Sequence, residues 1–127
     1  MQRISFAVLC NLFLLCLTVS CNFPHHGVAI QVSESGHYYT MNASFDPDET
    51  NKVEKYMNYK IGDASNMSFT NTRIDGQLSL DDHTTFYIKK FPGYLKILLD
   101  KEKNSVESFY RIKEMCDGIK TVITDQH

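Results

Sequence analysis

One stretch decides how this chain is interpreted, and it reads Gly36-His37-Tyr38-Tyr39-Thr40-Met41-Asn42-Ala43-Ser44-Phe45. Apolar and polar side chains alternate along it, and successive side chains of a β-strand point to opposite faces of a sheet. We therefore predict a long, half-buried strand over residues 36–45 that is entered through a glycine. One face would contribute to the core through Tyr39, Met41, Ala43 and Phe45. The other face would carry Tyr38, Thr40, Asn42 and Ser44 toward water.

The same stretch contains an acceptor sequence for N-glycosylation, Asn42-Ala43-Ser44, whose asparagine falls on the polar face of the predicted strand. A glycan at that position would point to water while the opposite face fills the core. A second acceptor sequence follows at Asn66-Met67-Ser68. We predict that Asn42 and Asn66 are both glycosylated.

The first 20 residues have the layout of a secretory signal peptide. Arg3 supplies a positive charge, the run over residues 4–19 is nearly all apolar, and small residues follow. A membrane anchor is the rival interpretation, but a spanning helix needs about 20 apolar residues and this run has roughly 16. A bacterial lipoprotein signal, with Cys21 as the lipidated residue, fits less well because Thr18 stands where leucine is usual. We predict a secreted, extracellular protein.

The remainder, residues 21–127, has the length of a single domain. The whole chain has 13 basic and 15 acidic residues, and no long run of one charge occurs in it. Nucleic acids and anionic membrane surfaces attract proteins mainly through such basic runs. We therefore expect neither nucleic-acid binding nor stable membrane insertion.

Two of the four cysteines, Cys10 and Cys16, lie inside the predicted signal peptide. Cys21 and Cys116 remain, close to the two ends of the predicted domain. In an oxidising compartment such a pair can form one disulfide, and the alternative is two unrelated free thiols. Cleavage after Cys21 instead of before it would leave Cys116 alone, and the signal does not settle this choice.

Several further segments are predicted to be extended. Val28, Ile30 and Val32 alternate with smaller or polar residues, as in a short strand. Residues 53–61 suit either a helix or a strand, and we favour the strand. Residues 67–72 alternate after the turn at residues 62–66 and are also expected to form a strand.

Two hairpins are predicted from their turns. Asp75-Gly76 has residue types that tolerate positive φ, which is typical of a two-residue hairpin turn. Pro92-Gly93 places proline and glycine at the central positions of a type II turn. This second turn would join a strand over residues 84–91 to another over residues 94–99.

The end of the chain has helical periodicity. Asn104 and Glu107 have the spacing of a capping box, and Gly118 is the expected C-terminal stop. Between them, apolar residues recur at helical spacing at Val106, Phe109, Ile112, Met115 or Cys116, and Ile119. We predict one amphipathic helix, followed by a short extended tail at Val122 and Ile123.

Several short motifs resemble the lipocalin superfamily, and within it the orosomucoid (alpha-1-acid glycoprotein) group and apolipoprotein M. The first is Gly36-His37-Tyr38-Tyr39 with Ala43-Ser44-Phe45, where tyrosine stands in place of the usual tryptophan of a Gly-x-Trp motif. The others are Asn66-Met67-Ser68-Phe69 with Asp75-Gly76, Ser108-Phe109-Tyr110-Arg111, Glu114-Met115-Cys116 and Val122-Ile123-Thr124-Asp125.

The resemblance implies an antiparallel up-and-down β-barrel with one C-terminal helix. It also implies a disulfide between Cys21 and Cys116, because that group joins an N-terminal cysteine to one in the closing helix. A lipocalin barrel has about eight strands, whereas this chain supplies about five or six. The barrel is therefore expected to be incomplete: either the chain is a shortened family member or the barrel stays open. The edges of an open barrel would be covered by the helix or paired in a homodimer.

No set of residues predicts catalysis, a cofactor or a metal site. His25-His26 has no third ligand that the sequence places beside it. Asp81-Asp82-His83 contains acid and base groups, but it lies between two predicted strands, where such residues ordinarily form a turn. We predict that the protein is not an enzyme.

Binding is the function that the composition favours. A sheet-lined pocket would hold a lipid, steroid or other small hydrophobic ligand, and such pockets are mainly apolar. The candidate lining residues are Tyr39, Met41, Phe45, Phe69, Phe86, Ile88, Tyr94 and Ile97. The alternative is a secreted protein-binding or inhibitory module without a cavity, in which the same side chains form an ordinary core. Such a module would act through loops such as residues 81–84 and 92–93.

Overall fold

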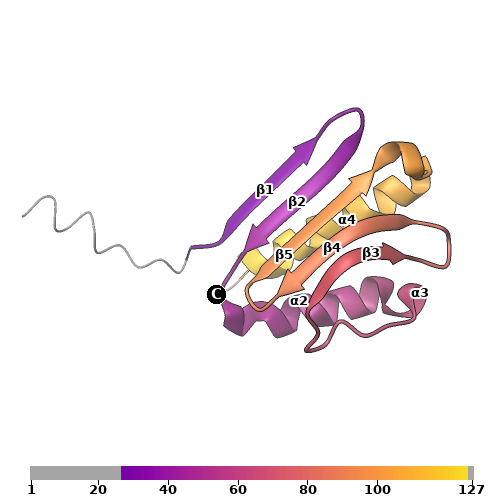
Figure 1. The fold of residues 1–127 in the computed structure, drawn as a ribbon. Coiled ribbons are helices and arrows are strands. Elements are labelled where there is room, and N and C mark those ends of the chain that lie inside the picture. Colours follow the sequence, from indigo (N-terminus) through magenta and orange to yellow (C-terminus); the bar gives the residue numbers. More distant parts are fainter. Residues whose placement is uncertain (1–26, 126–127) are drawn as a thin grey trace, which may run out of the picture.

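A five-stranded antiparallel sheet with helices packed on one face forms the domain (Figure 1). The computed structural model describes residues 27–125, so the predicted signal peptide, Cys21 and His25-His26 lie outside the described residues. The strands follow the order β1-β2-β5-β4-β3 across the sheet. Their bounds are β1 Ala29–Glu34, β2 Tyr38–Ser44, β3 Ile74–Ser79, β4 Thr85–Phe91 and β5 Tyr94–Asp100.

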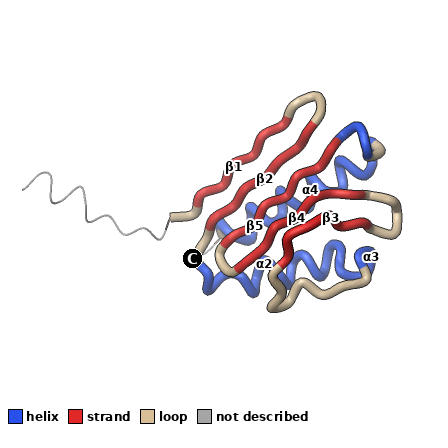
Figure 2. The backbone as a smooth tube through the Cα atoms, viewed as in Figure 1, coloured by secondary structure: helices blue, strands red, loops and turns tan. Residues whose placement is uncertain are grey.

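The helices come from two parts of the chain and form one layer (Figure 2). Between β2 and β3 lie the 3₁₀-helix η1 Pro47–Glu49, the α-helix α2 Thr50–Met57, the π-helical turn η2 Asn58–Gly62 and the short α3 Asp63–Ser65. After β5 come η3 Lys101–Lys103 and the long helix α4 Val106–Thr124. Helix α2 packs against α4, and together they cover one face of the sheet.

The prediction for the organising strand is confirmed. In β2, Tyr39, Met41 and Ala43 are at most 1% exposed, and Phe45 just beyond the strand is 6% exposed. These side chains face the helices, because the strand lies between β1 and β5 and has only one face covered. Local alternation was sufficient for this prediction, since a strand with one covered face has a period of two.

The sheet does not close into a barrel, so of the two alternatives left by the sequence the open one agrees with the structure. β1 and β3 are its two edges and do not pair with each other. The antiparallel strands and the C-terminal helix are confirmed. A closed barrel would bury its apolar face against itself, whereas here α2 and α4 cover that face, so closure is not needed to form a core.

The strand predicted over residues 53–61 is also wrong. This segment is helical, in α2 and the π-helical turn that follows it. Val53, Met57 and Ile61 are at most 1% exposed, and their spacing of four residues places them on one side of a helix. The competing strand pattern required Lys55 on the buried face, and Lys55 is exposed.

Residues 67–72 form a loop and not the predicted strand. The side chain of Asn58 holds this loop, because its Oδ1 accepts from the Phe69 N–H at 2.7 Å and its Nδ2 donates to Thr70 Oγ1 at 2.9 Å. Asn71 has φ of 54°. The Phe69 side chain is fully buried, so the loop contributes to the core without pairing in the sheet.

Of the two predicted hairpin turns, one is confirmed. Gly93 has φ of 79° in the turn between β4 and β5, as the Pro92-Gly93 pair predicts. Asp75 and Gly76 instead lie inside β3, opposite Lys89 and Ile88. The β3–β4 connection lies at residues 80–84, where the predicted turn at Asp81-Asp82-His83 occurs.

The predicted C-terminal helix exists, but both of its ends differ from the prediction. Ser105 is the N-cap and accepts from the Ser108 N–H, while Asn104 donates to the carbonyls of Thr85 and Asp100. The helix continues through Gly118 to Thr124, so Val122 and Ile123 are helical. A Cβ at Gly118 would lie 1.7 Å from the Tyr56 hydroxyl, so this glycine allows α2 to approach α4 and does not end the helix.

An ion pair ties the β3–β4 connection to α4. Arg111 donates to Asp82 Oδ2 at 2.7 Å, and the Thr84 N–H donates to Asp82 Oδ1 at 3.1 Å. Partial desolvation would raise the pKa of Asp82, but the hydrogen bonds from Thr84 and the charge of Arg111 outweigh it and lower this pKa to about 2.

We expect Asp82→Asn to destabilise the protein slightly, and only above acidic pH. A lowered pKa stabilises the folded state above the ordinary value of 3.8, and this contribution is lost as the pH falls toward about 2. Because the pair is half-exposed, the loss at about pH 6 should be under about 1 kcal/mol. Urea unfolding at a series of pH values should show the gap between the two proteins closing below about pH 4. A gap that is independent of pH would contradict this origin.

Candidate binding surface

The structure places seven of the eight predicted ligand-lining residues in the core. These residues are between 0% and 6% exposed and belong to one packed cluster beneath the helices: Tyr39, Met41, Phe45, Phe69, Phe86, Ile88 and Ile97. The eighth, Tyr94, lies on the opposite face of the sheet, because buried and part-exposed positions alternate along β5 from part-exposed Tyr94 to buried Leu95. The predicted set is therefore divided between the two faces of the sheet.

The opposite face of the sheet is not covered by any helix of the described chain (Figure 1). We call it the open sheet face. It is formed by alternate residues of β2, β4 and β5: Tyr38, Thr40, Asn42, Thr85, Tyr87, Lys89, Phe91, Tyr94, Lys96, Leu98 and Asp100. An antiparallel sheet commonly leaves one face to solvent, and such a face is usually polar. This one carries four aromatic rings and a leucine.

The aromatic side chains of the open sheet face are held in place by contacts with their neighbours. Phe91 and Tyr94 stack with ring centroids 4.7 Å apart and planes 12° apart. The Tyr87 hydroxyl donates to Asp75 Oδ1 at 2.6 Å, and this hydrogen bond raises the pKa of Tyr87. Tyr38 is 44% exposed at the end of the face. Rigid, partly exposed aromatic rings are typical anchors of protein interfaces.

A hollow of about 170 Å³ indents the open sheet face. Apolar groups of Tyr38, Tyr87 and Leu98 contribute to its wall, and Asp100 and Lys103 add charges. The remaining lining residues are Gln77, Thr85 and Phe86. A hollow of this size is suited to a single side chain of a partner, because ligand pockets for whole small molecules are larger, about 300–1,000 Å³.

Two lysines lie next to this hollow with their charges unpaired. The register places Lys89 directly opposite Lys96, and each is two residues from the paired Tyr87 and Leu98. Within residues 27–125, no carboxylate lies within 4.0 Å of either ammonium group. Like charges that face each other across a strand pair are destabilising. Asp75 of β3 lies opposite Lys89 on its other side and offsets part of this repulsion. Negative charge from a partner would relieve the rest.

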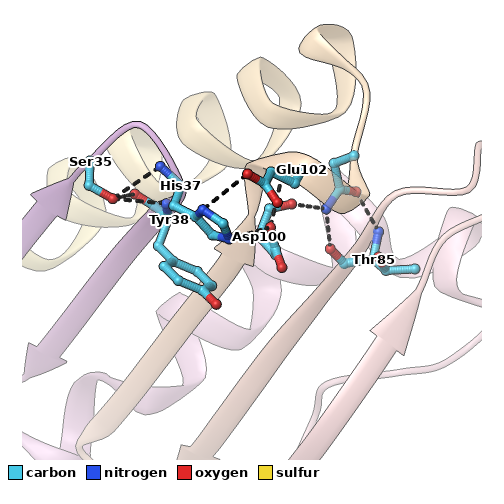
Figure 3. Close-up of polar contacts among 7 residues, drawn as sticks. Ser35, His37, Tyr38, Thr85, Asp100 and Glu102 are labelled. Carbon is cyan, nitrogen blue, oxygen red and sulfur yellow. Dashed lines mark hydrogen bonds and ion pairs between the residues drawn. The ribbon is translucent and has the colours of Figure 1, made fainter.

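At the end of the sheet, His37 joins the β1–β2 turn to the end of β5 (Figure 3). Its Nδ1 lies 3.1 Å from Glu102 Oε1, and its Nε2 lies 4.0 Å from Asp100 Oδ1. One ligand atom from each residue lies within 4.8 Å of the others, a separation compatible with a metal ion. His37 and Glu102 are exposed, and the Lys101 N–H also donates to the His37 carbonyl. We interpret the cluster as a surface tie between the turn and β5.

The two predicted glycosylation sites both lie at the surface. Asn42 is on the open sheet face, where the Tyr94 hydroxyl lies 3.4 Å from its Oδ1. Asn66 is exposed at the end of α3, with φ of 55°. We expect glycosidase treatment of the protein made in a eukaryotic secretory pathway to increase its gel mobility in two steps. Unchanged mobility would contradict the prediction.

Cys116 lies in the core of α4 and is 0% exposed, while its predicted disulfide partner, Cys21, lies outside the described residues. Burial raises the pKa of the Cys116 thiol to about 12. The neighbouring Tyr39 hydroxyl is also buried, and it has no hydrogen-bond partner among residues 27–125. A bridge to Cys116 would have to enter the core beside this hydroxyl.

The disulfide stays a prediction, and the burial of Cys116 decides how to test it. A free thiol at this position would resist alkylation in the native protein, because reactivity requires an accessible thiolate. The informative measurement is therefore intact mass after alkylation in denaturant without reductant. We expect no label at Cys116 unless the protein is first reduced. Labelling before reduction would rule out the bridge.

The sequence prediction missed the two lysines of the open sheet face and a buried ion pair between Glu54 and Lys90. A signal for the second was present, because Lys90 follows Phe86 and Ile88 on the apolar face of the predicted strand over residues 84–91. A lysine at such a position is almost never fully buried unless it is paired. Its partner was hidden because the segment around Glu54 was predicted to be a strand.

No family model, no curated protein and no solved structure matches this chain. The likeness to lipocalins therefore rests on the short sequence motifs alone. Among the residues that the structure describes, no helix has both the length and the apolar character needed to cross a membrane.

Proposed function

We propose that this chain is a secreted, non-enzymatic protein-binding module that uses its open sheet face to hold an acidic segment of a partner protein. One observation carries the proposal: seven of the eight residues expected to line a ligand pocket are packed against each other and the helices. Binding capacity therefore lies on the surface. The open sheet face combines partly exposed aromatic rings, a hollow and unpaired positive charge.

The chemistry of the face defines the partner segment. An apolar side chain would enter the hollow between Tyr38, Tyr87 and Leu98. Lys89 and Lys96 lie two residues along their strands from the hollow, about 7 Å away at the rise of a β-strand. A carboxylate about two positions from the apolar anchor of an extended peptide would reach them. Complementary charge of this kind gives specificity and faster association.

Selection from a displayed library of random peptides tests this proposal, with the deglycosylated protein as the target because Asn42 lies on the same face. We expect enriched peptides to contain an apolar residue close to aspartate or glutamate. Lys89→Glu with Lys96→Glu should weaken their binding by about tenfold or more, as expected for removal of close charge pairs. Lys52→Glu with Lys55→Glu makes the same charge change on the exposed side of α2 and should leave binding intact.

Two results would contradict the proposal. The first is enrichment of peptides without acidic residues, or equal loss of binding in both double variants. The second is saturable, competable binding of a retinoid, steroid or fatty acid at one site per chain, measured by displacement of an apolar dye. That second result would support a small-ligand carrier instead. It would also require the core to open, because the predicted lining residues in the core are buried.

A further inference from the structure

A polar pocket of about 390 Å³ lies where three distant parts of the chain meet. Its walls come from residues 47–54, from the loop at residues 71–73 and from the end of β4 with Pro92. The lining residues are Pro47, Asp48, Thr50, Asn51, Glu54, Asn71, Thr72, Arg73, Lys90 and Pro92. This volume is at the lower end of the range for small-molecule sites, about 300–1,000 Å³. None of these residues belongs to the open sheet face.

The most buried residues of the pocket are an ion pair with unused hydrogen-bonding capacity. Glu54 is 3% exposed and Lys90 is 2% exposed, and Lys90 Nζ donates to Glu54 Oε2. The other carboxylate oxygen, Oε1, is buried and has no donor in the described chain. An ammonium group has three N–H donors, and Glu54 is the one acceptor found for Lys90 among residues 27–125.

This arrangement is unusual because it leaves a charged oxygen both buried and unpaired. Buried polar groups nearly always have a partner in the protein or in bound solvent, and each exception requires an explanation. Glu54 and Lys90 both line this pocket, so the unpaired oxygen and the unused N–H donors belong to side chains that the pocket reaches. A ligand with a cationic donor next to an anionic acceptor would complement both groups.

The rim carries the same two signs of charge. Arg73 and Asp48 are exposed, and neither takes part in an ion pair within 4.0 Å in the part of the chain that the structure describes. The side chains of Asn51, Asn71 and Thr72 add neutral donors and acceptors. The inner part of the pocket holds one positive and one negative charge, so it is suited to the end of a polar ligand that also carries one charge of each sign.

We propose that this pocket binds a free amino acid with a polar side chain. Its ammonium group donates to the Glu54 carboxylate, and its own carboxylate accepts from the Lys90 ammonium. Its side chain points toward the rim, where Arg73 and Asp48 provide contacts of either charge. The two charges of the ligand zwitterion thus complement the two charges of the protein ion pair.

The test is titration of the ¹⁵N-labelled, full secreted protein with glutamine, glutamate and lysine, followed by the amide signals of Asn51, Asn71 and Arg73. We expect saturable shifts with the free amino acids. N-acetylglutaminamide keeps the side chain but lacks both backbone charges, and should cause none. No saturation with any free amino acid, or equal shifts with N-acetylglutaminamide or glucose, would overturn the proposal.

Rim variants connect the binding to this pocket without disturbing the buried pair. Arg73→Gln should weaken glutamate binding by about 1.5- to fivefold, the range for an exposed charge pair, and should change lysine binding little. Lys55→Gln removes an exposed cation from α2 outside the pocket and should leave both unchanged. Glu54→Gln does break the buried pair, so its folding is first checked by circular dichroism; the folded variant should bind all three amino acids about tenfold or more weakly, because it lacks a buried charged acceptor. Equal affinities of the wild type and Arg73→Gln for glutamate would place the binding elsewhere.

Discussion

Lys90→Met is expected to lower the free energy of unfolding by about 3–5 kcal/mol, the usual cost of removing one partner of a buried ion pair. Methionine fills a similar volume, so the packing around β4 is largely kept. The Glu54 carboxylate, which is 3% exposed, then remains in the core without its cation. Denaturant unfolding of both proteins, monitored by circular dichroism, measures the difference.

The matched control removes both charges. Glu54→Leu combined with Lys90→Met leaves no buried charge behind, and replacing a buried pair by apolar residues is often neutral or stabilising by about 1–4 kcal/mol. We therefore expect the double variant to be much more stable than Lys90→Met alone. If the two variants are equally destabilised, lost packing and not the unpaired charge is the cause. The double variant should also lose amino-acid binding while it remains folded.

Gly93→Ala is expected to destabilise the protein by about 2–5 kcal/mol for two separate reasons. The residue has φ of 79°, and a left-handed backbone costs a residue with a Cβ about 1–2 kcal/mol. The added Cβ would also lie 2.8 Å from the Phe45 carbonyl oxygen and 3.1 Å from Pro47 Cγ. Crowding of this kind typically costs about 1–3 kcal/mol. Thermal and denaturant unfolding should both show the loss.

Gly76→Ala provides the comparison, since a Cβ at Gly76 would meet no atom within 4 Å. Gly76 lies inside β3, where glycine is a poor strand former, so alanine should be neutral or slightly stabilising. Equal effects at the two glycines would show that the turn conformation and the contact with Phe45 are unimportant. The contrast also tests the fold directly, because the sequence pattern predicts a hairpin turn at Gly76, whereas the structure has a strand there.

The sequence pattern predicts some elements of this fold correctly and others wrongly, and the contacts of each element explain the difference. Local chemistry was sufficient where a single element decides the outcome. Alternation along residues 38–45 predicted both the strand and its faces, and Pro92-Gly93 predicted a turn with positive φ. Local chemistry was not sufficient at residues 53–61, where the strand and helix patterns both fitted. There, contact with α4 and the sheet favours the helix.

The candidate sites could not be predicted in the same way, because their members meet only after folding. Lys89 and Lys96 face each other because of the β4–β5 register, and Glu54 reaches Lys90 across 36 residues. The sequence identifies the aromatic residues as candidates for binding. Alternation along a strand defines two faces of the sheet, but it does not show which face the helices will cover.

By itself, then, the sequence determined the strands β2, β4 and β5, the two faces of β2, the Pro92-Gly93 turn and the presence of a C-terminal helix. These features depend on periodicity and on backbone preferences within a few residues. Only the tertiary structure decided that the sheet stays open, that its apolar face becomes a filled core and that polar groups gather in a pocket beside α2. The physical reason is that burial and pairing are properties of contacts between distant segments, which no local pattern contains.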